Sequence, residues 1–140
     1  MKLFITLSKS QLAAVLAAIL IGLIFIGQLT SADSGGIDAS TNALRMSYLK
    51  SLNLDPDDSS VSSKEIIIPT EFDEVYNRYN SLQKQAGFDL SRHKGEEATV
   101  YTYPFSADSD WQIHLIVCEG KVIGGDISSV RLDGEMKPLK

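Results

Sequence analysis

One apolar segment near the N-terminus constrains this chain more than any other feature. Leu12 to Gly27 contains no polar residue, and the run continues past Gln28 to Leu29. As a helix, these residues would measure about 27 Å at ~1.5 Å per residue, close to the hydrocarbon thickness of a bilayer. The segment therefore predicts a transmembrane anchor, and residues 1–32 are set aside before the fold is considered.

The flanking residues indicate an orientation for this segment. Lys2 and Lys9 precede it, whereas the first charges after it are Asp33 and Asp38. Because cations gather on the cytoplasmic side of a span, we expect a single-pass membrane protein with its N-terminus inside and its C-terminal domain outside. The alternative is a signal peptide cleaved near Thr30 to Ala32, which would give a secreted domain. The apolar run exceeds the usual ~7–15 residues of a signal peptide and favours the anchor.

Charge and cysteine content narrow the classes of partner and chemistry. Asp33 to Lys140 holds 11 Lys and Arg against 18 Asp and Glu, an acidic balance that disfavours nucleic acid and anionic lipid as partners. Cys118 is the single cysteine, so no intramolecular disulfide can form and packing must hold the fold. Its apolar neighbours favour a buried thiol of low reactivity.

The exported part divides into a linker, residues 33–63, and a folded domain, residues 64–140. Within the linker, Leu44, Tyr48, Leu49 and Leu52 recur at helical spacing and predict a helix over about residues 39–52, with Asp38, Ser40 or Thr41 as its N-cap. The acidic, serine-rich residues 53–63 follow as a loop.

The folded domain opens with a short strand, "KEIIIP", and then a helix. Thr70 and Asp73 form an approximate capping box at its start, and Gly87 suits a left-handed C-terminal cap. Between them runs one apolar stripe at three- and four-residue steps. Its members are Phe72, Val75, Tyr76, Tyr79, Leu82 and Ala86.

Three further β segments complete the domain. "EATVYTYPF" alternates, and "WQIHLIVCEGKVIGGDISSV" predicts two strands joined by a tight turn at Glu119 and Gly120. The strand from Trp111 should place Ile113, Leu115 and Val117 on one face, and His114, Ile116 and Cys118 on the other. The fold class we expect is α+β, with one or two helices on a mostly antiparallel sheet of about four strands.

The residues give little sign of catalysis or of a metal centre. His93 and His114 share no HxxxH or HExxH spacing, and "DPDDSS" lacks the glycine and the final glutamate of a calcium loop. No nucleophile elbow is present. We therefore predict no catalytic residue, no metal and no cofactor.

A weak candidate ligand surface remains, made of Tyr101, Tyr103, Gly124, Gly125 and Asp126. The glycine pair more plausibly marks a β-bulge or a close approach by a helix than a phosphate cradle, since no helix follows it. The tyrosines, together with Tyr76 and Tyr79, could line a pocket between helix and sheet, although such residues more often belong to a core.

Residues Lys64 to Met136 resemble a family known as domain of unknown function 4830, found in small exported or membrane-anchored proteins of clostridia-like bacteria. The similarity lies in "VYNRYNSLQK", "GFDLS" and "KVIGGDISS". An aromatic residue is expected where Cys118 stands, and an aromatic-Met-His ending where this chain has Glu135, Met136 and Lys137. The resemblance implies a domain behind an N-terminal anchor and brings no catalytic residue.

These observations predict a binding or interaction module at the cell envelope. Its partners would be the membrane, through Leu12 to Leu29, and an envelope protein or peptide. Two alternatives stay open: a small envelope hydrolase using the carboxylates of Asp108, Asp110 and Asp126, and a secreted domain that binds a small ligand.

Overall fold

The computed structural model describes residues 35–140, and those from Gly36 to Lys140 form one compact unit. None of the helices among the described residues is both long and apolar enough to cross a membrane. The apolar segment Leu12 to Leu29, on which the predicted anchor depends, lies outside the described residues.

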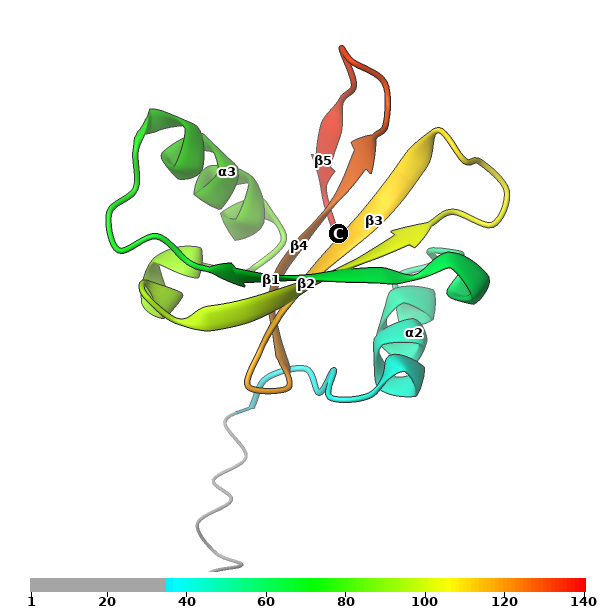
Figure 1. The fold of residues 1–140 in the computed structure, drawn as a ribbon, viewed down its shortest axis with the longest axis horizontal. Coiled ribbons are helices and arrows are strands. Elements are labelled where there is room, and N and C mark those ends of the chain that lie inside the picture. Colours follow the sequence, from blue (N-terminus) through cyan, green and yellow to red (C-terminus); the bar gives the residue numbers. More distant parts are fainter. Residues whose placement is uncertain (1–34) are drawn as a thin grey trace, which may run out of the picture. The chain divides into compact units, whose positions relative to one another are not determined.

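The unit is built on one five-stranded antiparallel sheet (Figure 1), one strand more than the sequence predicted. Its strands lie side by side in chain order, each hydrogen-bonded to the strand before and the strand after. The additional strand is the shortest and lies at one edge. The strands are β1 (Ser62–Ile67), β2 (Glu97–Pro104), β3 (Trp111–Cys118), β4 (Lys121–Ser129) and β5 (Met136–Pro138).

Strand β3 is central, and both of its faces are covered. Leu115 and Val117 pack into one cluster of buried side chains, and Ile116 and Cys118 pack into another on the opposite face. This alternation confirms the predicted faces of the strand. The turn to β4 is also confirmed: φ is 49° at Glu119 and 76° at Gly120, the two positive values that a tight hairpin turn of this kind requires.

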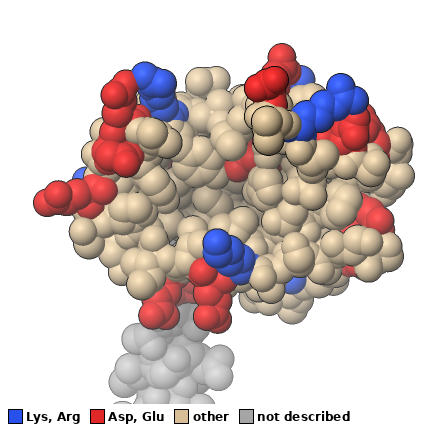
Figure 2. Space-filling model, turned by 45° about the horizontal axis from the view of Figure 1, so that its top comes forward, with Lys and Arg blue, Asp and Glu red and all other residues tan. Residues whose placement is uncertain are grey.

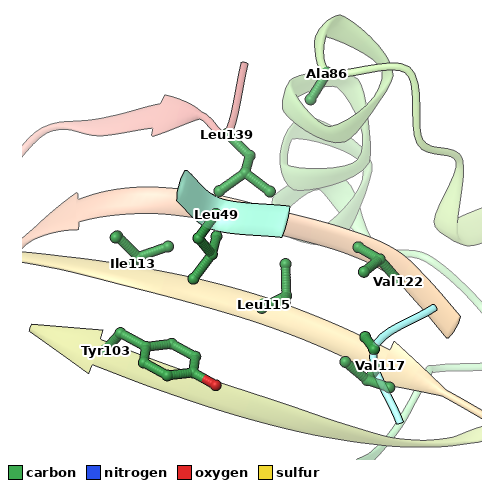
Figure 3. Close-up of a cluster of buried hydrophobic side chains, with 9 residues drawn as sticks. Leu49, Ala86, Tyr103, Ile113, Leu115, Val117, Val122 and Leu139 are labelled. Atoms are coloured by element: carbon green, nitrogen blue, oxygen red, sulfur yellow. The ribbon is translucent and has the colours of Figure 1, made fainter. Parts of the chain in front are cut away.

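Helix α2 (Asn42–Ser51) covers the first of these faces. It begins at Thr41, whose hydroxyl accepts the backbone N–H of Leu44 at 3.3 Å. Leu49 is fully buried among sheet side chains (Figure 3). The segment that we expected to be a linker, residues 33–63, therefore supplies a helix to the core.

Helix α3 (Glu74–Gln85) packs with the second face (Figure 1). Asp73, not Thr70, is its N-cap and accepts the N–H of Tyr76 at 2.7 Å. At the other end Gly87 adopts φ 83°, which confirms the predicted left-handed cap, and the N–H of Phe88 donates to the carbonyl of Gln83 at 3.0 Å, as in a Schellman motif.

The buried face of α3 differs from the predicted apolar stripe. Val75, a member of that stripe, is 74% exposed, whereas Asn80 and Gln83 are buried. The amides are buried because each bonds backbone: the Asn80 carbonyl oxygen accepts the N–H of Leu90 at 2.8 Å, and that of Gln83 accepts the N–H of Gly125 at 2.8 Å. These hydrogen bonds offset part of the cost of burying the amides, although the buried Nε2 of Gln83 has no hydrogen-bond partner among the described residues.

The pairing of β4 with β3 and the close contacts around β4 explain why glycines occupy positions 124 and 125. A register shift between β3 and β4 leaves Ile123 without a partner, which is the predicted β-bulge. A Cβ on Gly125 would lie 2.6 Å from the carbonyl oxygen of His114, so only glycine fits. Three groups bond the edge of β4 that faces away from β3. The carbonyl of Ile37 accepts the N–H of Val122 at 2.9 Å, the Gln83 amide oxygen accepts the N–H of Gly125, and β5 pairs with the end of the strand.

Asp89 connects α3 to the short 3₁₀ helix η2 (Leu90–His93) that follows it. Its carboxylate accepts hydrogen bonds from the Ser91 hydroxyl at 2.6 Å, the Asn80 amide at 3.0 Å and the Ser91 N–H at 3.1 Å. These bonds, the Ser91 hydroxyl first, hold the pKa of the Asp89 carboxyl well below its usual 3.8.

Because this pKa is depressed in the folded state, the stabilisation is present above about pH 4 and is lost as the pH falls below it. We expect Asp89→Asn, which removes the charge and keeps the carbonyl acceptor, to flatten the fall in unfolding free energy between about pH 4 and pH 2. Urea unfolding of both proteins across that range measures this. Parallel curves would contradict the assignment, and Asp133→Asn on an exposed loop is the matched control.

Candidate functional site

The residues of the predicted ligand surface lie on opposite faces of the sheet. Tyr101 and Tyr103 belong with the α2 cluster, whereas Gly124 faces Gln83 and Leu90 on the α3 side. Tyr103 is fully buried, and its hydroxyl accepts from Nε of Arg45 at 2.9 Å. The five predicted residues therefore do not form one surface. Tyr76 and Tyr79 pack across the sheet from Tyr101 and Tyr103, so the four tyrosines belong to two cores, the alternative that the sequence favoured over a pocket.

Asp126 is the predicted residue with the most chemistry around it. Its carboxylate is buried, accepts the Tyr79 hydroxyl at 2.7 Å, and lies 3.0 Å from Nδ1 of His114. Burial raises the pKa of the Tyr79 phenol, and the Asp126 charge raises it further, so this hydroxyl stays a neutral donor. The carboxylate thereby joins α3 to the centre of the sheet.

A serine completes this group, yet the geometry is not that of a nucleophilic triad. The Ser128 hydroxyl lies 3.1 Å from Nδ1 of His114, the same nitrogen that faces Asp126. In a triad, the acid and the nucleophile contact opposite nitrogens of the imidazole. Asp126 and Ser128 therefore fix the orientation of the His114 ring, and the Ser128 hydroxyl is not activated as a nucleophile.

The carboxylates proposed for a hydrolase do not converge. Asp110 pairs with Arg131 on the surface, and Asp108 accepts the backbone N–H of Asp110 at 2.9 Å, which ties the loop. The N–H of Val130 donates to the Asp110 carbonyl, so Val130 marks the position of Asp110 beside β4. Asp126 lies four residues before Val130, which corresponds to about 13 Å along an extended chain at ~3.3 Å per residue. That separation exceeds the spacing of most carboxylate pairs that act on a common bond.

A groove of about 1060 Å³ lies instead at one end of the sheet, with β1, β2 and β3 as its floor. The register places Glu65, Thr99 and Val117 in one row across the three strands, and Ile67 and Glu97 in the next. Since Val117 belongs to the α2 cluster, this is the α2 face, beyond the area that the helix covers. The groove's wall comes from residues 39–40 and 119–120.

The groove is acidic. Glu65, Glu96, Glu97 and Glu119 line it, and no lysine or arginine among the described residues does. Elsewhere, Arg78, Lys84, Arg131 and Lys137 each pair with a carboxylate, and Figure 2 shows blue side chains next to red ones around the rim of the face in view. Among the described residues, neither Glu65 nor Glu97 has such an ion pair.

A second cluster, His93, Glu96 and Cys118, lies where η2 and β2 meet the end of β3. The Glu96 carboxylate lies 2.7 Å from Nδ1 of His93 and accepts the Cys118 thiol at 3.3 Å. These hydrogen bonds lower the pKa of the Glu96 carboxyl. The thiol is buried, as predicted, and burial, followed by the hydrogen bond with Glu96, raises the pKa of Cys118 to about 11.

Sequence reasoning missed the groove and this cluster for the same reason. Each set brings together residues that lie far apart in the sequence, and their proximity depends on strand register; only His93 and Glu96 of the cluster are local neighbours, three residues apart. One signal was available: two of the four groove glutamates stand at strand ends, since Glu97 begins β2 and Glu119 directly follows β3, where antiparallel pairing brings side chains together.

The described residues thus define the class: an α+β domain with a five-stranded antiparallel sheet, two helices and an acidic groove. Comparisons with protein-family models, with curated proteins and with solved structures found no match. The resemblance to domain of unknown function 4830 stays a prediction.

Proposed function

We propose that this protein is a membrane-anchored binding module of the cell envelope and that its groove binds a cationic, extended peptide segment of an envelope protein. The observation that carries the proposal is the groove, whose lining within residues 35–140 contains four glutamates and no lysine or arginine. A basic segment would gain charge pairs there, and charge complementarity raises both specificity and association rate.

The edge of the sheet supports the extended conformation of the partner. Strand β1 is the first strand of the sheet, and no described residue pairs with its outer edge. Glu65 and Ile67, which line the groove, belong to this strand, and Ile67 is 66% exposed. A peptide that pairs with β1 would satisfy the free backbone groups and present alternate side chains to the groove.

The anchor supports the placement at the envelope. Leu12 to Leu29 has the length and composition of a transmembrane helix, and Lys2 and Lys9 favour an N-terminus inside. An anchored domain would hold its partner near the membrane and raise the local concentration of both.

The test measures binding of a labelled peptide of alternating lysine and valine to the full-length chain in detergent, by fluorescence anisotropy. We expect saturable binding that weakens as salt rises, and no binding of the glutamate-valine counterpart. The double substitution Glu65→Lys with Glu97→Lys should weaken binding at least about tenfold, because it replaces two attractive charges with repulsive ones.

The matched control is Glu71→Lys with Glu135→Lys, which changes the net charge equally at exposed positions outside the groove. It should change the dissociation constant by less than about threefold, since exposed charges far from the peptide are screened. Equal losses in both double variants would show that net charge alone attracts the peptide, and would argue against the groove.

A further inference from the structure

Three side chains that can bind a metal ion converge beside the groove. Candidate ligand atoms of His93, Glu96 and Cys118 all lie within 4.8 Å of one another. Ligands about 2.0–2.3 Å from a tetrahedral zinc ion lie roughly 3.3–3.8 Å apart. Nδ1 of His93 and Sγ of Cys118 lie 2.7 Å and 3.3 Å from the same Glu96 oxygen, so side-chain adjustments of about an ångström would admit an ion.

The donor set selects the kind of ion. An imidazole nitrogen, a carboxylate oxygen and a thiolate sulfur together suit Zn²⁺, whereas Ca²⁺ and Mg²⁺ take oxygen ligands. Structural zinc sites use four protein ligands, and three leave the fourth position to water or another ligand. The cluster therefore has the composition of an open site.

The backbone around the cluster is fixed by short hydrogen bonds. The N–H of Glu96 donates to the His93 carbonyl at 3.1 Å, which holds two of the ligands on one turn. Ile68 secures that turn on both sides: it accepts the Gly95 N–H at 2.8 Å and donates to the Glu96 carbonyl at 2.9 Å. Cys118 is 6% exposed at the end of the central strand. Ligands held in this way lose little freedom on binding.

An ion could reach the cluster from solvent. The side chains of His93 and Glu96 are 29% and 47% exposed, so the buried thiol is approached past two polar groups. Glu96 and Cys118 also line the groove. The Cys118 side chain itself packs on the α3 face, opposite the groove, so the open position would face solvent.

We propose that His93, Glu96 and Cys118 form an open Zn²⁺ site with water as the fourth ligand. On binding, the thiol releases its proton to solvent, and bonds to the ion replace the present hydrogen bonds of the Glu96 carboxylate. The proposal is independent of peptide binding, because Glu65 and Glu97 take no part in the site.

The test uses the reduced full-length chain in detergent, with Co²⁺ as a spectroscopic probe and Zn²⁺ as its competitor. We expect one Co²⁺ per chain with a thiolate-to-cobalt charge-transfer band, lost on addition of Zn²⁺. Cys118→Ser should abolish the band. His93→Ala and Glu96→Gln should each weaken Zn²⁺ binding at least about tenfold, in line with the losses that follow changes around a metal.

Two comparisons keep the test decisive. Glu71→Gln, at an exposed carboxylate outside the cluster, should bind as the unchanged protein does. His93 and Glu96 are at the surface, so their variants should keep the far-ultraviolet dichroism of the parent even if Cys118→Ser unfolds. Absence of the band in the parent, or undiminished binding in both surface variants, would overturn the proposal.

Discussion

Gly125→Ala is expected to destabilise residues 36–140 by about 3 kcal/mol, the upper part of the usual range for overpacking. The new methyl carbon would lie 2.6 Å from the carbonyl oxygen of His114 on the neighbouring strand and 2.9 Å from a methyl carbon of Leu139. A backbone oxygen in the middle of a sheet cannot withdraw without breaking the pairing of β3 with β4. Urea unfolding followed by circular dichroism measures the change.

Gly124→Ala is the matched control for this substitution. Its methyl carbon would meet only side-chain atoms, namely Oε1 of Gln83 at 2.9 Å, then Leu90 at 3.2 Å and Ile116 at 3.3 Å. Side chains can shift more readily than a paired strand, so we expect a loss of about 1 kcal/mol. Equal losses at the two positions would contradict the explanation of Gly125 by its backbone contact.

Leu49→Ala is expected to cost about 3 kcal/mol, within the range for removing a buried leucine side chain. Leu49 is fully buried between α2 and the sheet (Figure 3). Leu44→Ala, in the same helix at a position that is 39% exposed, should cost less than about 1 kcal/mol. The same urea titrations give both values.

A small loss of stability in Leu49→Ala would contradict the assignment of α2 to the folded core. If Leu49→Ala cost no more than Leu44→Ala, α2 would not be part of the cooperative unit, and residues 33–63 would behave as the linker that the sequence suggested. A difference of about 2 kcal/mol between them places the helix within the unit that unfolds together.

The elements that the sequence predicted well are those set by local signals. The tight turn at Glu119 and Gly120, the alternation of β3, and the C-terminal cap at Gly87 each depend on neighbouring residues, and the structure confirms all three. The strand β5 was missed because three residues ending in Pro138 carry no strand pattern. It exists because β4 offers an edge there.

The buried face of α3 was predicted wrongly because hydrophobicity was taken as the only guide to burial. Asn80 and Gln83 are buried because their side chains bond backbone groups, which belong to η2 and to β4 respectively. Such partners are known only once the chain is folded. The candidate site was missed for a related reason, since the groove and the His93, Glu96 and Cys118 cluster each combine residues from three or more segments.

The strictly sequential order of the strands has a consequence for how the domain folds. Each strand pairs with its neighbour in the chain, and the connections from β2 to β5 are short, with only two residues in the β3–β4 turn, so little loop entropy is lost as these hairpins close. The pairing of β1 with β2 spans residues 68–96, which include α3. Low average separation between contacting residues favours fast folding, here on the order of milliseconds. The bonds of Ile37 and Ala39 to the β3–β4 hairpin span more than half of the chain, and we expect this N-terminal segment to dock last.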